Sequence, residues 1–276
     1  MPIPEEKLKD SSASPLNQQR GYWNQVSDDF TESRRHLLWR AHSDQVNTRL
    51  FENLMQEKQF GRVLKTDLFD ESLTAGLYPC LAGHAEEVHG MDLSESCIRQ
   101  AARRYPEMKT YRADIRETEF ADGSFDGVVS TSTLDHFEFA EELEQALGEI
   151  HRILKPGGEL FITMDNLQNP AIWLRNMLPY RWLGKSGLVP YFVGHTVTRN
   201  GLHRLLEQTG FCTRDSRPVL HCPRVLAVPY SEMVRKRGNS GSQDRLLERL
   251  LAWERLERWP CSWFTAHFVA VHAIRL

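Results

Sequence analysis

From Gly61 onward, short apolar segments alternate with amphipathic ones, and this alternation constrains the fold more than any other feature of the sequence. We expect strands over residues 62–68, 87–91, 109–113, 125–130 and 159–164. The spacing of apolar residues predicts helices between them, over 72–81, 94–105 and 138–154. Strands that alternate with helices are joined by right-handed crossovers, so the sequence predicts an α/β fold with a mostly parallel sheet and helices on both faces.

The N-terminal quarter has a different pattern. Residues 1–20 are polar and contain three prolines, which predicts a flexible tail. Residues 21–60 are expected to form a helical cap, because apolar residues recur at helical spacing over 34–58. The domain itself is then expected to span 61–276.

The last third is expected to carry two insertions. Residues 166–197 contain many aromatic residues, leucines and prolines without a long period, which is typical of a lid after the fifth strand. A second insertion is expected at about 230–260, with a helix over 244–258 after the polar segment KRGNSGSQ. Strands near 211–220 and 263–274 complete the predicted sheet.

Composition excludes several protein classes. Hydrophobic residues make up 41% and charged residues 26% of the chain, as in ordinary globular proteins. The net charge of −3 gives no general attraction to nucleic acid or to an anionic membrane. The five cysteines form no CxxC pair, the histidines show no metal-binding spacing, and no apolar run is long enough for a membrane span. We therefore expect a cytoplasmic protein without disulfides or a metal.

Two acidic residues stand where predicted strands end. Asp92 follows the second strand and Asp114 the third. Ligands of open α/β sheets bind at the carboxyl ends of the strands, where one carboxylate can accept from a ribose diol and another from an adenine amino group. Each residue also has a structural interpretation, because Asp92 can begin the next helix and Asp114 can stabilise a turn.

The order of the motifs resembles a known family. The segments GMDLSESCIRQAA, ADIRETEFADGSFDGVVSTSTLDHF and ALGEIHRILKPGGELFIT are similar to motifs of class I S-adenosylmethionine (SAM)-dependent methyltransferases that act on small molecules. The close similarity covers residues 88–163. It implies a Rossmann-like, mostly parallel seven-stranded sheet of order 3-2-1-4-5-7-6, ending in an antiparallel hairpin, with SAM as cofactor.

The resemblance also implies roles for individual residues. By position, Asp92 would bind the SAM ribose, and Asp114 with Ile115 the adenine. Leu93 is also expected to contact the cofactor. Ser130 and Thr131 end the fourth strand and would face the methionine part of the cofactor.

The first motif departs from the family. In GRVLKTDLFDESLTAG, Lys65 stands near the usual acidic position, and Asp67, Leu68 and Phe69 occupy the usual glycine positions. Larger side chains restrict the backbone there. If SAM binds, Asp67 or Asp70 would accept from its ammonium group. Lys65 would otherwise form an ion pair with Asp67 or Asp92 and fix the loop.

The segment STLDHF follows the fourth strand, where acceptor and methyl group meet in this family. His136 is the candidate general base, because imidazole titrates near neutral pH, and Asp135 could orient it. Alternatively, Asp135 caps the next helix and His136 packs beneath the lid. Tyr22, Trp23 and Phe30 either close over the cofactor or pack in the core.

These features predict a methyltransferase with a small, apolar or aromatic acceptor. The altered first motif also allows a catalytically inactive SAM-fold protein that serves as a binding or scaffold subunit. The sequence has no GxGxxG motif, which argues against a nicotinamide dehydrogenase. It also has no basic stripe that would indicate a nucleic-acid partner. The aromatic insertion is compatible with a homodimer contact.

Overall fold

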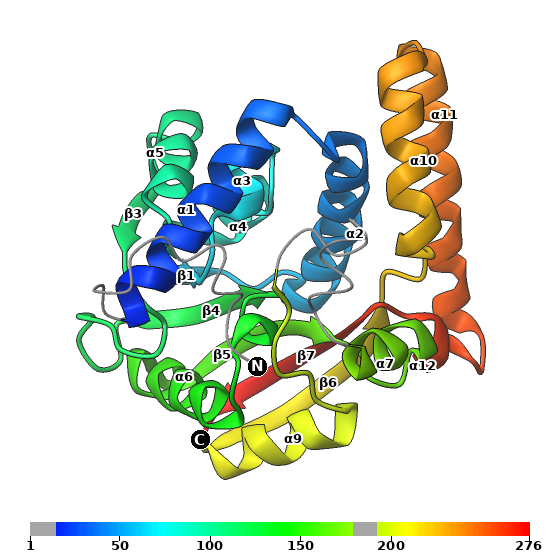
Figure 1. Ribbon diagram of the computed structural model, residues 1–276. Coiled ribbons are helices and arrows are strands. Elements are labelled where there is room, and N and C mark those ends of the chain that lie inside the picture. Colours follow the sequence, from blue (N-terminus) through cyan, green and yellow to red (C-terminus); the bar gives the residue numbers. More distant parts are fainter. Residues whose placement is uncertain (1–14, 179–191) are drawn as a thin grey trace.

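The computed structural model describes residues 15–178 and 192–276. Seven strands form one sheet in the order β3-β2-β1-β4-β5-β7-β6 (Figure 1). The strands are β1 (Phe60–Lys65), β2 (Ala85–Asp92), β3 (Lys109–Arg112), β4 (Phe125–Thr131), β5 (Leu154–Asp165), β6 (Phe211–Val219) and β7 (Phe268–Arg275). β7 is antiparallel to both of its neighbours, β5 and β6, and the remaining pairs are parallel. The predicted fold class and strand order are confirmed.

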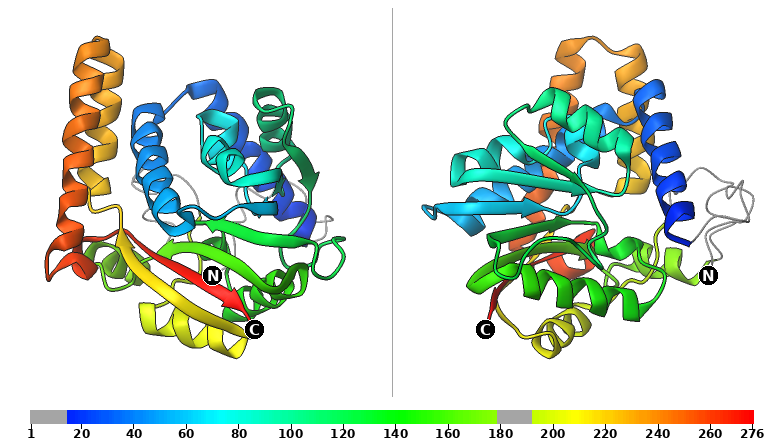
Figure 2. Two further views of the ribbon diagram at one scale, coloured as in Figure 1. Left: turned by 180° about the vertical axis from the view of Figure 1, so that it is seen from behind. Right: turned by 90° about the vertical axis from the view of Figure 1, so that its left-hand side faces the viewer.

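Helices cover both faces of the sheet, as Figures 1 and 2 show. One face carries α2 (Leu37–Met55), α3 (Phe69–Leu73), α4 (Tyr78–His84) and α5 (Glu95–Arg104). The other carries α6 (Ala140–Ile153) and α9 (Arg199–Gln208). The N-terminal helix α1 (Pro15–Ser33) packs against α3 and α5. Its first turn therefore lies within the segment expected to be a tail.

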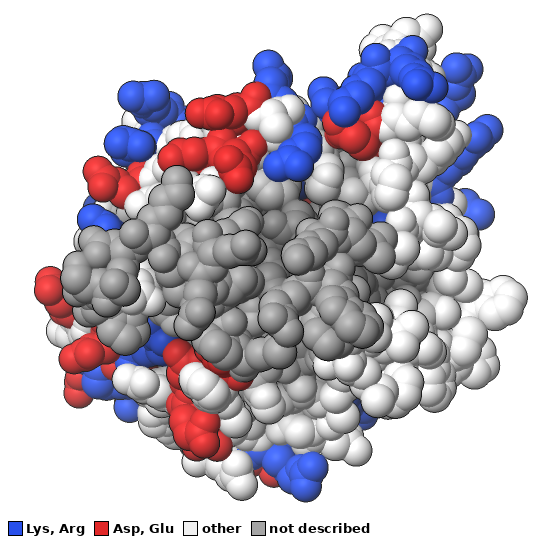
Figure 3. All heavy atoms as spheres, in the orientation of Figure 1, with Lys and Arg blue, Asp and Glu red and all other residues white. Residues whose placement is uncertain are grey.

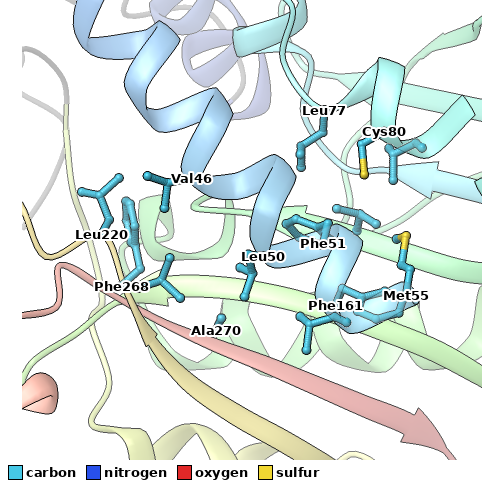
Figure 4. Packing of buried hydrophobic residues seen from close by; sticks show 14 of the residues in the cluster. Val46, Leu50, Phe51, Met55, Leu77, Cys80, Phe161, Leu220, Phe268 and Ala270 are labelled. Carbon is cyan, nitrogen blue, oxygen red and sulfur yellow. The ribbon is translucent and has the colours of Figure 1, made fainter. Parts of the chain in front are cut away.

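The hydrophobic core has two layers, one on each face of the sheet. In the first layer, α2 packs Val46, Leu50, Phe51 and Met55 onto the sheet (Figure 4). Phe161 of β5 lies near Phe51 and Met55. The second layer lies beneath α6 and α9 and includes fully buried leucine and isoleucine side chains of α6. The parallel strands are thus covered on both faces, which is the usual requirement of a parallel sheet.

The helix expected over 72–81 is two helices in the structure. Between α3 and α4 the chain breaks at Gly76, whose φ of +58° is unfavourable for residues with side chains. Two buried side chains accept hydrogen bonds from the backbone N–H groups at the break. Asp44 accepts from Gly76 at 3.1 Å, and Glu71 accepts from Leu77 at 2.8 Å. Long-range hydrogen bonds therefore determine the break, and periodicity does not reveal it.

The second expected insertion is a helical hairpin that extends from the sheet (Figure 1). Its helices are α10 (Arg224–Arg237) and α11 (Ser240–Leu251), and η3 (Ala252–Arg258) follows. α10 contains Pro229 and was not predicted as a helix. The last strand was expected from residue 263, but α12 (Ser262–Thr265) occupies that position and β7 begins at Phe268.

The predicted lid at 166–197 is described in part. It begins with α7 (Pro170–Met177), whose preceding Asn169 accepts from the N–H of Ala171. Residues 179–191, which include Tyr180, Trp182 and Tyr191 of the aromatic stretch, lie outside the described residues. Within the described ranges, no helix is long and apolar enough to cross a membrane.

Candidate functional site

A pocket opens at the carboxyl edge of the sheet, where the crossover connections diverge between β1 and β4. The predicted site residues that line it are Asp67, Asp70, Asp92, Leu93, Asp114, Ile115, Thr131 and His136. Two predicted residues do not line it: the side chains of Ser130 and Asp135 are buried behind the wall. One cavity therefore brings together most of the residues that were predicted separately.

Asp92 is held by the backbone of two loops. Its Oδ2 accepts from the N–H of Leu68 at 2.8 Å, and its Oδ1 accepts from the N–H of Ser94 at 2.7 Å. Each oxygen retains a second lone pair for a ligand. Burial raises the pKa of Asp92 to about 6. The N-cap of α5 is Ser94, whose side chain accepts from Cys97, so Asp92 is not the cap itself.

Asp114 forms an ion pair with Arg116. The Arg116 guanidinium donates to both carboxylate oxygens, with Nη2 2.6 Å from Oδ2 and Nε 3.0 Å from Oδ1. Arg116 also donates to Gln19 of α1 at 2.6 Å and pairs with Glu142 of α6. Ile115 is buried in the pocket wall beside this group. The carboxylate of Asp114 is therefore less available to a ligand than that of Asp92.

Lys65 is buried beneath the first loop. Its Nζ lies 3.0 Å from the carboxylate of Asp67 and 3.1 Å from that of Glu71. Burial alone would lower the pKa of Lys65, but these carboxylates hold it above its usual value. Thr133 also donates to the Asp67 carboxylate, at 3.0 Å. The ion pair with Asp67, one of the two pairings considered for Lys65, is present.

Of the three residues at the usual glycine positions, Asp67 and Phe69 line the pocket, whereas Leu68 does not. The Leu68 side chain is fully buried, and it fills the space next to Gly90 of β2. A Cβ atom on Gly90 would lie 2.5 Å from Leu68 Cδ2. Because Gly90 has no side chain, β2 leaves room for the Leu68 side chain beside the pocket.

Arg40 of α2 is a pocket residue that the sequence analysis missed. Its guanidinium pairs with Asp70 and lies 4.3 Å from the ring centre of Phe69. Its Nε is buried and has no hydrogen-bond partner among the described residues. The sequence signal was an arginine directly between the apolar residues Trp39 and Ala41.

His136 faces the pocket from η2 (Leu134–His136). Its Nδ1 lies 2.8 Å from the carbonyl oxygen of Phe192. Because a carbonyl only accepts, Nδ1 carries the proton of the neutral ring and Nε2 is the basic nitrogen. Trp23 of α1 packs edge-on against the imidazole, with ring centres 4.9 Å apart.

Asp135 holds the loop that carries His136. Its Oδ2 accepts from Ser132 Oγ at 2.9 Å and from the N–H of Asp165 at 3.3 Å. Burial, followed by the neighbouring Asp165, raises the pKa of Asp135. These hydrogen bonds hold η2 against the end of β5, so Asp135 positions the loop that carries His136.

Helix α1 borders the pocket. Tyr22 and Trp23 line the pocket, and Tyr22 Oη accepts from the N–H of Phe192 at 2.7 Å. Phe30 lies outside the lining and packs against Phe69. The helix is fixed to α5 by hydrogen bonds such as that from Ser94 Oγ to Asn24, at 2.9 Å.

The chain is similar to known methyltransferases. Residues 72–162 match the family model described as a methyltransferase domain. A curated demethylmenaquinone methyltransferase of Chlorobaculum parvum is 29% identical over 138 residues, which cover 45% of this chain and 56% of that protein. The chain therefore spans little more than half the length of this relative.

Solved structures share the fold. The [4+2]-cyclase SpnF superposes with a TM-score of 0.56 at 18% identity, covering 84% of this chain and 81% of SpnF. Geranyl diphosphate C-methyltransferase from Streptomyces coelicolor superposes with a TM-score of 0.55 at 14% identity, covering 100% of this chain and 88% of that one.

Proposed function

Because the chain carries a domain of the class I SAM-dependent methyltransferase family, we propose that it transfers a methyl group to a small apolar or aromatic acceptor. The observation that carries the proposal is the pocket at the strand ends, where the carboxylates of Asp67, Asp70 and Asp92 face the same cavity as the Arg40 guanidinium. Such a set of groups suits a ligand with a diol, an ammonium and a carboxylate.

The residues present fit SAM, although the first loop differs from the family. The lone pairs left on Asp92 would accept from the ribose diol. The buried, unpartnered Nε of Arg40 indicates a missing anionic partner, which the methionine carboxylate would supply. Met91 and Ile115 provide the apolar contacts that an adenine ring needs.

The ammonium group would be held by the acidic side chains of the first loop. Lys65 faces the carboxylates of Asp67 and Glu71, and burial raises the pKa of Glu71. Asp67 is the member of this group that lines the pocket. The carboxylate of Asp70 pairs with the cation Arg40. We assign the ammonium to Asp67 and Asp70 together, in place of the backbone contacts that a glycine loop offers.

The acceptor side of the pocket is apolar. Trp23, Phe137 and Phe192 line it together with His136. SAM, when bound, supplies an electrophilic methyl group on a sulfonium. The aromatic walls would position the acceptor and exclude water, which can contribute most of the acceleration of an in-line displacement. Nε2 of His136 would take the proton of an acceptor that must be deprotonated.

One observation supports a second candidate, a SAM-fold protein without transferase activity. The carboxylate of Asp67 is already paired with Lys65, and that of Asp114 with Arg116, so less of the site is available to a cofactor. SpnF, which shares the fold, is named a cyclase, so the fold by itself does not fix the reaction.

Calorimetry with SAM and with S-adenosylhomocysteine tests the proposal. We expect micromolar or tighter binding of both, followed by transfer of a labelled methyl group to apolar aromatic compounds in an acceptor screen. Binding without transfer to any acceptor class would favour the second candidate. Absence of binding would contradict the cofactor assignment.

A further inference from the structure

Helix α10 presents an apolar stripe that nothing in the described structure covers. Its exposed apolar residues repeat on successive turns and share one face: the pair Val225 and Leu226, the pair Pro229 and Tyr230, and Met233. Val225 is 58% and Leu226 72% exposed. The opposite face, with buried Ala227 and Ser231, packs against α2 and α11. A folded protein exposes so continuous an apolar surface chiefly where it binds something.

The same stripe ends in positive charge. Lys236 and Arg237 continue the exposed face by one more turn at the tip of the hairpin. The acidic residue of this helix, Glu232, pairs with Arg235 at 2.6 Å and with Lys236 at 3.4 Å. One carboxylate thus stands against the three cations Arg235, Lys236 and Arg237, and the tip keeps a net positive charge. Figure 3 shows Lys and Arg gathered at the top of the hairpin above a largely uncharged surface.

The charge of the hairpin is opposite in sign to that of the chain. Residues 224–260 contain eight Arg and Lys and five Asp and Glu, whereas the whole chain has a net charge of −3. The general argument from net charge therefore does not hold for this segment. An excess of positive charge disfavours face-to-face packing of two hairpins and favours an anionic surface.

The segment also carries exposed tryptophans. Trp253 is 44% and Trp259 60% exposed, at the base of the hairpin in η3 and just after it. Tryptophan is enriched at the boundary between lipid and water, because its ring is apolar and its N–H remains hydrated. Apolar residues on one face, tryptophans and flanking Lys or Arg are the composition of helices that lie in the membrane interface.

Charged side chains link the first residue of α10 to the carboxyl edge of the sheet, where the pocket lies. Asp165, at the carboxyl end of β5, pairs with Arg175 of α7 at 2.7 Å and lies 3.4 Å from His267. His267 Nε2 is 3.3 Å from Arg224, the first residue of α10. On α7, the apolar side chains of Trp173 and Met177 are also exposed, by 52% and 64%.

We propose that the α10 stripe, with Lys236 and Arg237 at its tip, docks the protein on the surface of a bilayer that contains anionic lipid. The apolar residues enter the headgroup boundary while the two cations contact the headgroups. Neither helix of the hairpin spans the bilayer, and the contact is peripheral and reversible.

Sedimentation of the full chain with vesicles tests this proposal. Vesicles of phosphatidylcholine alone are compared with vesicles that also contain phosphatidylglycerol. We expect binding to the anionic vesicles that weakens as salt is raised, because salt screens exposed charges. The double variant Lys236→Gln/Arg237→Gln should bind them at least about tenfold more weakly, since each cation near the surface contributes to binding.

A second variant and two controls separate docking from other causes. Leu226→Gln/Tyr230→Gln should lose vesicle binding while its thermal melt stays unchanged, because both side chains are exposed. Leu276→Gln and Arg99→Gln/Arg103→Gln change exposed residues elsewhere and should bind as the original chain does. Equal binding to both vesicle types, no binding, or equal losses in the controls would overturn the proposal. So would a dimer in sedimentation equilibrium that the Leu226→Gln/Tyr230→Gln variant dissociates.

Discussion

Leu68 and Gly90 occupy complementary positions, because the leucine side chain fills the space that a side chain on β2 would take. Gly90→Ala should place Cβ 2.5 Å from Leu68 Cδ2 and displace the first loop. We expect a loss of about 1–3 kcal/mol in the free energy of unfolding, as for other overpacked cores. SAM affinity should fall with it, since the N–H of Leu68 binds Asp92.

The double variant Gly90→Ala/Leu68→Ala checks the cause. It should recover part of the lost stability, and denaturant unfolding of the four proteins gives the coupling energy between the two positions. Gly148→Ala in α6 is the control, because nothing lies near its Cβ and alanine favours a helix. Additive losses without coupling would show that the two residues do not fit together as described.

Asp92→Asn should weaken SAM binding by about tenfold to a hundredfold, because two charge-assisted hydrogen bonds become neutral ones. For the original chain, the affinity should fall as the pH drops below about 6, since burial raises the pKa of Asp92 to that value and the protonated carboxyl accepts less well. Calorimetry between pH 5 and about 8 measures both effects. A variant with the same affinity and the same pH profile as the original would exclude the ribose role.

Arg40→Gln should weaken SAM at least about tenfold while leaving adenosine binding unchanged, because adenosine lacks the carboxylate that Arg40 would hold. Asp70→Asn should show the same selectivity through the ammonium. Competition binding with both ligands gives the comparison. Arg35→Gln, at an exposed position outside the pocket, should change neither affinity. Equal losses for SAM and adenosine would indicate damage to the fold instead.

His136→Gln should lower kcat by about 100-fold to 10,000-fold for an acceptor that must lose a proton, while SAM affinity stays within about twofold. The reason is that Nε2 is the basic nitrogen, as Nδ1 donates to Phe192. Single-turnover methyl transfer with an acceptor found in the screen is the measurement. If kcat is retained, the acceptor reacts without a base and the histidine serves only as part of the wall.

Asp44→Asn should remove part of the pH dependence of stability. Burial raises the pKa of Asp44 from its usual 3.8 to about 7, so the folded state favours the protonated form. The stability that this proton contributes is present below the usual pKa and is lost as the pH rises through about 7. Relative to the original chain, the variant should gain on the order of 1–3 kcal/mol between pH 5 and 8. Parallel pH profiles from denaturant unfolding would contradict the assignment.

The sheet was predictable because its signals are local. Apolar strands, the turn at Gly157 and Gly158, and acidic residues at two strand ends are all visible within short segments. The alternation of strands and helices predicts a mostly parallel sheet, and the carboxylates of Asp92 and Asp114 then meet at its carboxyl edge. The strand order itself came from the resemblance to the family.

What could not be predicted depends on partners far apart in the sequence. Arg40 reaches the pocket only because α2 packs beside the first loop, where Asp70 meets it. The break at Gly76 depends on Asp44, which is 32 residues away. The helix α10 was missed because Pro229 and an exposed apolar face contradict the pattern of an ordinary amphipathic helix.

The buried Lys65 couples the evolution of the residues around it. Asp67 and Glu71 lie within an ion-pair distance of its Nζ, and Asp70 also raises the pKa of Lys65 and of Glu71. Glu71 in turn helps to raise the pKa of Asp44. Replacing Lys65 alone with an acidic residue would leave the buried side of this cluster without a cation. Removing Glu71 alone would leave the N–H of Leu77 unsatisfied. A lineage can therefore restore the usual first motif only through several changes made together, and homologues should carry this loop either as a complete set or not at all.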